Sequence, residues 1–241
     1  MSELLLPPPY RSVRIEAQRS AVAAAREAAA AGAEEGAIFW SERSDRLDAA
    51  LLLAPDRTRR ETLPVIYVAG LAFAEALGLF APPPTPISFR WPGGIVIDGG
   101  LAGHLSLACA PSAADAVPAW AILGFELALA SAEDEPGRTP YSTSVAEEGF
   151  EDFSVAAQLE GFSRHFLAWL SRWESEGLAP VAAEWSRRAF GLGETAPLIL
   201  PDGESGTPLA LDVEGSLRLG QGERERLLPL EAALAEAARH G

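Results

Sequence analysis

Two apolar runs joined by a glycine turn constrain the fold of this chain more than any other feature. Residues 94–97 read Gly-Ile-Val-Ile, residues 98–100 read Asp-Gly-Gly, and residues 101–110 begin with Leu-Ala-Gly and stay largely apolar. Gly99 and Gly100 supply the positive φ angles that a tight turn between two strands requires. The stretch therefore predicts a β-hairpin, and with it a sheet that contains antiparallel strands.

Helix and strand patterns fill the chain on both sides of this hairpin. Helices are expected over residues 16–31, 62–80, 150–177 and 180–191. Strands are expected over residues 37–40, 46–55, 87–90 and 118–130. Ser144, with Glu147 three positions later, has the pattern of a capping box and predicts a helix start at that point.

The sequence changes character after Gly191. Short apolar segments are then separated by Asp-Gly, Ser-Gly, Glu-Gly and Gln-Gly turns, and a short helix pattern closes the chain. We therefore expect two domains, residues 1–190 and residues 191–241, of which the second is a small β unit. The order of helices and strands predicts an α+β fold, in which a mixed or antiparallel sheet is covered by helices.

Composition argues against several classes of protein. The 241 residues carry a formal charge of −15, from 34 acidic and 19 basic side chains, so no nucleic-acid partner is expected. No apolar run reaches the roughly 18 residues of a membrane span, so no membrane association is expected. The single cysteine, Cys109, is compatible with a reducing cytoplasm, where we expect the protein. All 19 basic residues are arginine, which excludes catalysis by a lysine amine.

Signatures of common catalytic and metal sites are absent from the sequence. It contains no Gly-x-Ser-x-Gly, P-loop or Gly-x-Gly-x-x-Gly motif, and no Cys-x-x-Cys or His-Glu-x-x-His spacing, so no metal site is expected. His104, His165 and His240 are scattered, and a structural role is favoured for the first two. Residues 131–144 form a long polar loop of the kind that is often functional in a compact domain.

Arg90 stands directly before Trp91 and Pro92, at the end of a predicted strand. An arginine held against an aromatic ring and a rigid turn is suited to bidentate binding of a carboxylate or phosphate. Gly93 and Gly94 follow, and glycine permits a ligand to approach the backbone closely. The alternative is a surface arginine stacked on the Trp91 ring. Both interpretations remain open from the residues alone.

This stretch resembles the signature of the biotin–protein ligase branch of the biotin/lipoate ligase family. That signature is Lys-Trp-Pro-Asn-Asp, then a hairpin and Leu-Ala-Gly, and its counterparts here are Arg90, Trp91, Pro92, Gly93, Gly94, Leu101, Ala102 and Gly103. Residues 31–55 are similar to the family's Arg/Gly-rich loop and Trp-x-Ser strand entry, with Trp40 and Ser41 at the entry. Residues 122–128, which include Gly124, resemble the family's Ile-Gly-x-Gly strand.

The resemblance implies a fold, a reaction and a set of ligands. The fold is the family's catalytic domain followed by a small SH3-like barrel. The reaction couples ATP, with Mg²⁺, to biotin or a related carboxylic acid, and then transfers the acyl group to a lysine of a biotinyl or lipoyl carrier domain. Arg90 is implied to contact the carboxylate or α-phosphate, and the other signature residues, with Trp40, Ser41 and Gly124, to line the ligand site. A homodimer is left open as the assembly.

The chain departs from the family signature where positive charge is needed during adenylation. The Arg/Gly-rich loop corresponds to residues 31–37, which contain Glu34 and Glu35 and no arginine. Arginine replaces the signature lysine, two glycines replace its Asn-Asp pair, and Glu126 begins the segment that replaces a later Gly-x-Asn. The adenylate-binding motifs are therefore expected to be degenerate.

Arg43 and Arg46 follow the degenerate loop and are candidate replacements for the missing phosphate contacts. Two hypotheses result. The first is a divergent ligase that still adenylates biotin or a related acid. The second is a non-catalytic protein that binds a small carboxylate or has a regulatory role.

Overall fold

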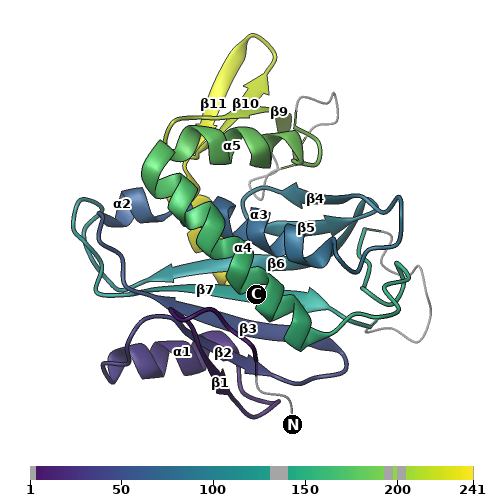
Figure 1. The fold of residues 1–241 in the computed structure, drawn as a ribbon. Coiled ribbons are helices and arrows are strands. Elements are labelled where there is room, and N and C mark those ends of the chain that lie inside the picture. The colour runs from purple at the N-terminus through teal and green to yellow at the C-terminus, as the bar shows by residue number, and fades with distance from the viewer. Residues whose placement is uncertain (1–3, 131–140, 193–197, 200–204, 241) are drawn as a thin grey trace.

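A seven-stranded sheet forms the centre of the computed structural model, which describes residues 4–130, 141–192, 198–199 and 205–240 (Figure 1). Neighbouring strands are antiparallel except β1 and β2, which are parallel. The sheet order is β1 (Arg11–Arg14), β2 (Ala37–Ser41), β3 (Arg46–Leu53), β7 (Ala121–Ala128), β6 (Gly100–Cys109), β5 (Gly94–Ile97) and β4 (Ile87–Arg90). This mixed sheet confirms the predicted fold class. The hairpin of β5 and β6 is also confirmed, although its positive φ angles lie at Asp98 and Gly99, one residue earlier than predicted.

Helix α1 (Ala21–Ala30) packs on one face of the sheet through small side chains. Its buried residues Ala21, Ala24 and Ala25 form a separate apolar cluster with side chains of β2, β3 and β7. Ser20 begins the helix because its Oγ accepts an N–H of the first turn. The helix therefore starts at residue 21 rather than at the predicted residue 16, and Gly32, with φ of 81°, follows its end as expected.

Helices α3 (Val65–Leu77) and α4 (Val155–Glu176) lie on the opposite face of the sheet (Figure 1). Aromatic contacts join the three layers, because Phe125 of β7 stacks on Phe73 of α3 at 5.8 Å and meets Phe162 of α4 edge-on at 4.6 Å. The helix predicted over residues 62–80 is α3, which spans the narrower range Val65–Leu77 and begins after Pro64. A separate short helix, α2 (Arg59–Thr62), ends just before it.

The helix start predicted at Ser144 is wrong. The Ser144 Oγ accepts the Glu147 N–H at 3.3 Å and donates to the Glu147 carboxylate at 2.9 Å, but residues 145–149 form turns. Helix α4 begins only after Ser154, whose Oγ caps it. Residues 131–140 of the predicted polar loop lie outside the described residues. Within the described ranges, no helix is long and apolar enough to cross a membrane.

A second, antiparallel sheet of four strands follows α5 (Leu178–Arg187), as predicted for a small C-terminal β unit. Its order is β11 (Arg224–Leu228), β10 (Leu217–Gln221), β9 (Ser205–Leu211) and β8 (Leu198–Ile199), and α6 (Leu230–His240) ends the chain. Leu230 and Leu234 of α6 belong to the core that α3 and α4 share with the main sheet. Glu231 pairs with Arg59 at 2.6 Å. The division into domains at residues 190 and 191 stays a prediction.

Candidate ligand-binding site

A row of residues crosses the sheet next to the N-terminus of α1. Residues that pair directly across neighbouring strands project to the same face. The strand registers give this row, from β4 to β2, as Arg90, Gly94, His104, Glu126, Asp48 and Ser41. Because Asp48 accepts the N–H of Ala21, the first residue of α1, the row projects on the face that α1 covers.

Helix α1 covers only part of this face. It packs on β2, β3 and β7, and Figure 1 shows it well away from β4 and β5. Residues of α3, α4, α5 and α6 contribute to the cluster on the opposite face instead. Over β6 the row therefore continues beside α1, where His104 and Ser106 are half-buried. Among the described residues, no helix packs over the strip formed by β6, β5 and β4 on this face, and this strip is the candidate ligand-binding site.

Two carboxylates face each other at the centre of the row, Asp48 on β3 and Glu126 on β7. Asp48 is 6% exposed, and both its carboxylate oxygens lie 3.3 Å from the Ala21 nitrogen. Burial raises the pKa of Asp48 and the Glu126 charge raises it further, while the bond from the Ala21 N–H acts in the opposite direction. The N-terminus of α1, which would otherwise attract an anion, already holds a carboxylate of the protein.

The Trp40 and Ser41 pair is divided between the two faces of β2. Ser41 lies in the row beside Asp48; it is fully buried, and its Oγ has no hydrogen-bond partner among the described residues. Trp40 projects to the opposite face, is 4% exposed, and donates its Nε1–H to the Ser12 Oγ at 2.8 Å. The structure thus gives Trp40 a packing role in the core, and only Ser41 borders the candidate site.

Of the two arginines that follow β2, Arg43 is fully engaged. It binds both carboxylate oxygens of Asp45, at 2.8 and 2.6 Å, and donates to the Ala17 carbonyl at 2.9 Å. This hydrogen bonding holds the pKa of the Asp45 carboxyl at about 2. Arg46 is exposed, lies two residues before Asp48 on the same face of β3, and makes no ion pair in the described part of the chain. Arg46 is the more available cation.

Arg90 lies at the other side of the candidate site, at the end of β4. Its Cζ is 5.8 Å from the centre of the Phe190 ring, so it stacks on Phe190 and not on Trp91. Among the described residues it has no carboxylate partner, which leaves its donors available. Four strand intervals of about 4.8 Å separate β4 from β3, so Arg90 and Arg46 flank the site from roughly 19 Å apart.

Trp91, in the turn between β4 and β5, binds to α3 and does not cover the candidate site. Its Nε1–H donates to the Tyr67 hydroxyl at 2.8 Å, and that hydroxyl donates to the Gly215 carbonyl in the C-terminal unit. Pro92 is half-buried in the turn after β4. Trp91 therefore ties the position of β4 to both α3 and the C-terminal sheet.

The glycines of the signature serve close packing between strands. A Cβ at Gly93 would lie 2.3 Å from the Leu105 carbonyl oxygen, and the Gly93 carbonyl accepts the Leu105 N–H at 2.7 Å. A Cβ at Gly103 would lie 2.1 Å from the Glu126 carbonyl oxygen. The absence of a side chain at these two positions lets neighbouring backbone segments of the protein pack closely. At Gly93 the space is taken by the Leu105 carbonyl, so the structure gives no support there for the close approach of a ligand.

The remaining signature residues surround the row. Leu101 lies over Gly94, because a Cβ on that glycine would be 3.1 Å from the Leu101 Cδ1. Ala102 is 3% exposed and belongs to the core on the opposite face. At Gly124 a Cβ would meet the Ser106 Oγ at 2.4 Å and the Val22 Cγ2 at 2.6 Å. Gly124 thus lets α1 and β6 close over β7 at the edge of the candidate site.

Glu34 and Glu35 lie far from Arg90, contrary to the expectation that they share its site. They precede Gly36, whose N–H donates to the Leu52 carbonyl at 2.8 Å next to β2. Five strand intervals of about 4.8 Å separate β2 from β4, which is roughly 24 Å. These two carboxylates therefore cannot repel a phosphate held by Arg90.

The acids that lie next to the site, in the same row, are Asp48 on β3 and Glu126 on β7. Sequence reasoning noted Glu126 only as a departure from the family strand and missed Asp48. The available signal was Asp48 itself, the single charged residue of the otherwise apolar segment 47–53. Within the described ranges, no group of three or more His, Cys, Asp or Glu side chains is placed to hold a metal ion.

Comparison with known proteins finds relatives in sequence and in fold. The sequence model of the biotin/lipoate A/B protein ligase family matches residues 6–187. The biotin–[acetyl-CoA-carboxylase] ligase of Paracoccus denitrificans is 29% identical over 201 residues, which cover 79% of this chain and 80% of that protein.

Solved structures of biotin protein ligases and of a ligase-like protein have the same fold as this chain. A biotin protein ligase-like protein of unknown function from a Silicibacter species is 30% identical, with a TM-score of 0.87 over 95% of this chain and 98% of that one. The fold is also that of the Aquifex aeolicus biotin protein ligase in complex with biotin and ATP, which is 14% identical, with a TM-score of 0.72 over 90% of this chain and 95% of that one. The chain therefore belongs to the biotin/lipoate A/B protein ligase family.

Proposed function

We propose that this protein activates biotin, or a related carboxylic acid, with ATP and passes the acyl group to a lysine of a carrier protein. The observation that carries this proposal is the strip of sheet beside α1 over which no described helix packs. Arg90 and Arg46, which have no carboxylate partner among the described residues, lie at its two sides. The Paracoccus relative is a ligase that acts on acetyl-CoA carboxylase, and the Aquifex structure holds biotin and ATP.

Arg90 would contact the carboxylate of the acid or the α-phosphate. Negative charge gathers on these groups during nucleotidyl transfer, and a guanidinium with unpaired donors can stabilise it. Phe190 and the β4 backbone limit the positions that this side chain can take. The bond from Trp91 to Tyr67 fixes the neighbouring residue, so the cation is oriented by packing as well as by charge.

Mg²⁺ fits this site only together with ATP. Among the described residues, no group of three acidic, histidine or cysteine side chains could hold the ion alone, and Asp48 already accepts the Ala21 N–H. The phosphate oxygens of ATP would therefore hold Mg²⁺, apart from the two carboxylates of the row. Mg²⁺ would then neutralise phosphate charge, while the positioning of the acid would depend on the side chains of this chain.

The test is pyrophosphate release from ATP by the purified protein, with biotin and lipoate as separate substrates. Arg90→Gln should lower kcat/KM about 10- to 100-fold, because it removes a charge-assisted contact. Arg26→Gln is the matched control, since Arg26 is exposed on α1 and lies outside the row.

Three outcomes separate the hypotheses. Release that depends on biotin or lipoate and falls in Arg90→Gln supports the ligase. Calorimetric binding of the acid without any pyrophosphate release shows the non-catalytic alternative. Absence of binding of either acid or of ATP to the folded protein contradicts both. Cytoplasmic location and a homodimeric assembly belong to the same proposal, and light scattering of the purified protein tests the second.

A further inference from the structure

A cavity lies on the α3 side of the main sheet, apart from the row beside α1. Its volume is about 400 Å³, within the range of small-molecule sites. Its lining comes from the N-terminal segment, the turn before β2, the segment after β3, the start of α3 and the C-terminal half of α4. No residue of the row that contains Arg90 and Asp48 lines this cavity.

One wall of the cavity is apolar. It consists of Leu53, Val65, Leu167, Leu170 and Trp173. Val65 and Trp173 are 3% and 6% exposed and belong to the main core, so this wall is held by packing behind it. An apolar group placed against the wall would be removed from water, which favours binding.

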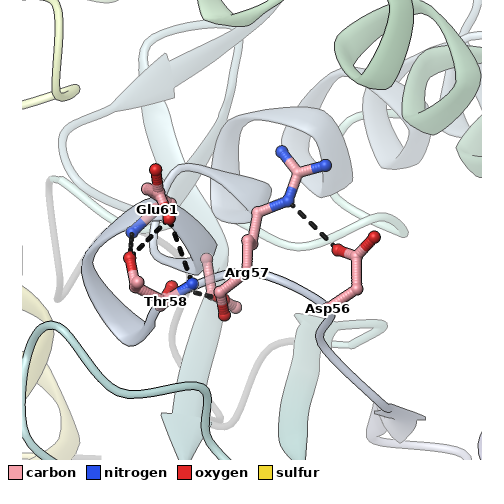
Figure 2. A network of polar contacts seen from close by, with 5 residues as sticks. Asp56, Arg57, Thr58 and Glu61 are labelled. Carbon is pink, nitrogen blue, oxygen red and sulfur yellow. Dashed lines mark hydrogen bonds and ion pairs between the residues drawn. The ribbon is translucent and has the colours of Figure 1, made fainter.

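Arg57 supplies a positive charge at the cavity. Its guanidinium lies over the Trp173 ring, with Cζ 4.2 Å from the ring centre, and its Nε is 3.4 Å from the Asp56 carboxylate. Figure 2 shows the two terminal nitrogens pointing away from Asp56. Across the part of the chain that the structure describes, these nitrogens have no hydrogen-bond or ion-pair partner. They are therefore free to bind a carboxylate in the bidentate manner.

The backbone that carries Arg57 is also fixed. The next residue, Thr58, caps α2 in a capping box with Glu61, as Figure 2 shows. The Arg57 carbonyl accepts the Thr62 hydroxyl at 3.3 Å. Since both ends of the side chain are held, by α2 and by Trp173, little conformational freedom is lost when a ligand binds.

The other charges at the cavity limit which anions can enter. Three carboxylates line it. Asp56 pairs with Arg57, whereas Glu35 and Glu174 have no partner among the described residues. Burial raises the pKa of Tyr10, another lining residue, so its hydroxyl stays protonated and can donate. A singly charged anion can reach Arg57, whereas a phosphate ester or dicarboxylate would bring further charge towards the two glutamates.

We propose that this cavity binds a small monocarboxylate with an apolar body. The carboxylate accepts two hydrogen bonds from the terminal nitrogens of Arg57. The apolar body lies against Leu53, Val65 and Leu170. The inference does not depend on the proposed ligase reaction, because it uses none of the residues assigned to that reaction.

The test is calorimetric titration of the full-length protein with 3-phenylpropanoate, compared with 3-phenylpropanamide and 3-phenylpropylamine. These probes share one apolar body and differ in charge. The acid should bind at least about tenfold more tightly than the amide, and the amine should bind no better than the amide. Arg57→Gln should weaken binding of the acid about 10- to 100-fold and leave binding of the amide unchanged.

Matched variants separate this site from others. Arg60→Gln is the control for the loss of a nearby arginine, since Arg60 is exposed and does not line the cavity. Arg90→Gln should also leave acid binding unchanged, which distinguishes this cavity from the site beside α1. Leu170→Asp, which places a charge on the apolar wall and leaves Arg57 in place, should weaken binding of both acid and amide by about tenfold or more.

The proposal is overturned if the folded wild-type protein binds no acid at millimolar concentration, or binds the amine as tightly as the acid. It is also overturned if folded Leu170→Asp binds the acid as tightly as the wild type, a result that remains decisive should Arg57→Gln fail to fold. Loss of acid binding in Arg90→Gln would assign the acid to the site beside α1 and refute the second site.

Discussion

The β4–β5 hairpin, which carries Arg90 next to its turn, is linked to the C-terminal unit through one buried hydroxyl. Removing that hydroxyl tests how much the link contributes to stability. Tyr67 of α3 is fully buried. Its hydroxyl accepts the Trp91 Nε1–H at 2.8 Å and donates to the Gly215 carbonyl. Tyr67→Phe keeps the ring, and with it the edge contact to Trp185 at 5.0 Å, but leaves one donor and one acceptor without a partner.

The expected magnitude depends on the burial of these two groups. A buried polar group that loses its partner costs about 1–3 kcal/mol. The Gly215 carbonyl faces the fully buried ring of Tyr67, so the upper part of that range applies to it. Trp91 is half-buried, and water can replace part of its lost bond. We therefore expect a loss of about 2–4 kcal/mol in the free energy of unfolding, or roughly 4–16 °C in Tm for a chain of this size.

The assay is urea denaturation followed by circular dichroism, with calorimetric melting in parallel. Tyr141→Phe is the matched control, because Tyr141 is 76% exposed and its hydroxyl is open to water; its stability should stay within about 0.5 kcal/mol of wild type. A loss below about 0.5 kcal/mol in Tyr67→Phe would show that the bridge contributes no net stability and would refute the reasoning.

Three further changes test the sheet and its cap. Gly103→Ala places a Cβ 2.1 Å from the Glu126 carbonyl oxygen, so β6 and β7 must separate, and chemical denaturation should show a loss of about 3 kcal/mol or more. The folded-state pKa of Asp48 is raised, so its contribution is present at low pH and is lost as pH rises through that pKa; Asp48→Asn should flatten the decline of Tm measured upward from about pH 4. Ser154→Ala removes the α4 cap and should lower the free energy of unfolding by about 1 kcal/mol in thermal melts followed by circular dichroism.

Local sequence patterns predict most helices, strands and turns of this fold, because each of these elements depends mainly on residues that are close in sequence. The glycine turn after β5 needs only its own φ angles, and α1 needs only its alanines and a capping serine. The helix predicted at Ser144 was wrong because the capping pattern, too, depends only on residues close in sequence. Ser144 and Glu147 form their local bonds, but Gly149 has φ of 75°, which ends the turn before a helix can form. A capping box predicts a first turn, and the residues after that turn decide whether a helix grows.

The site could not be predicted in the same way, because it depends on strand register. Asp48 and Glu126 are far apart in sequence and meet only because β3 pairs with β7. A shift of one residue in that pairing would send one of them to the opposite face. Glu34 and Glu35, by contrast, were placed by analogy with a family loop, and the bond from Gly36 to Leu52 holds them beside β2. Sequence similarity was enough to locate the segment that carries Arg90. The positions of the charged side chains around it could be known only from the pairing of the strands.

The arrangement of charges also decides where a phosphate can lie in the proposed reaction. Beside Arg46 it would be about 6 Å from the central carboxylates, where each ionised one costs about 3 kcal/mol at an effective dielectric constant near 20. Beside Arg90, three strand intervals from Glu126, the separation is roughly 14 Å and the cost falls to about 1 kcal/mol. We therefore expect the phosphates at the Arg90 side and the neutral part of the acid towards Asp48. Glu126→Gln should then change the KM for ATP less than about threefold in the pyrophosphate assay, while a decrease of about tenfold or more would place the phosphates beside the carboxylates instead.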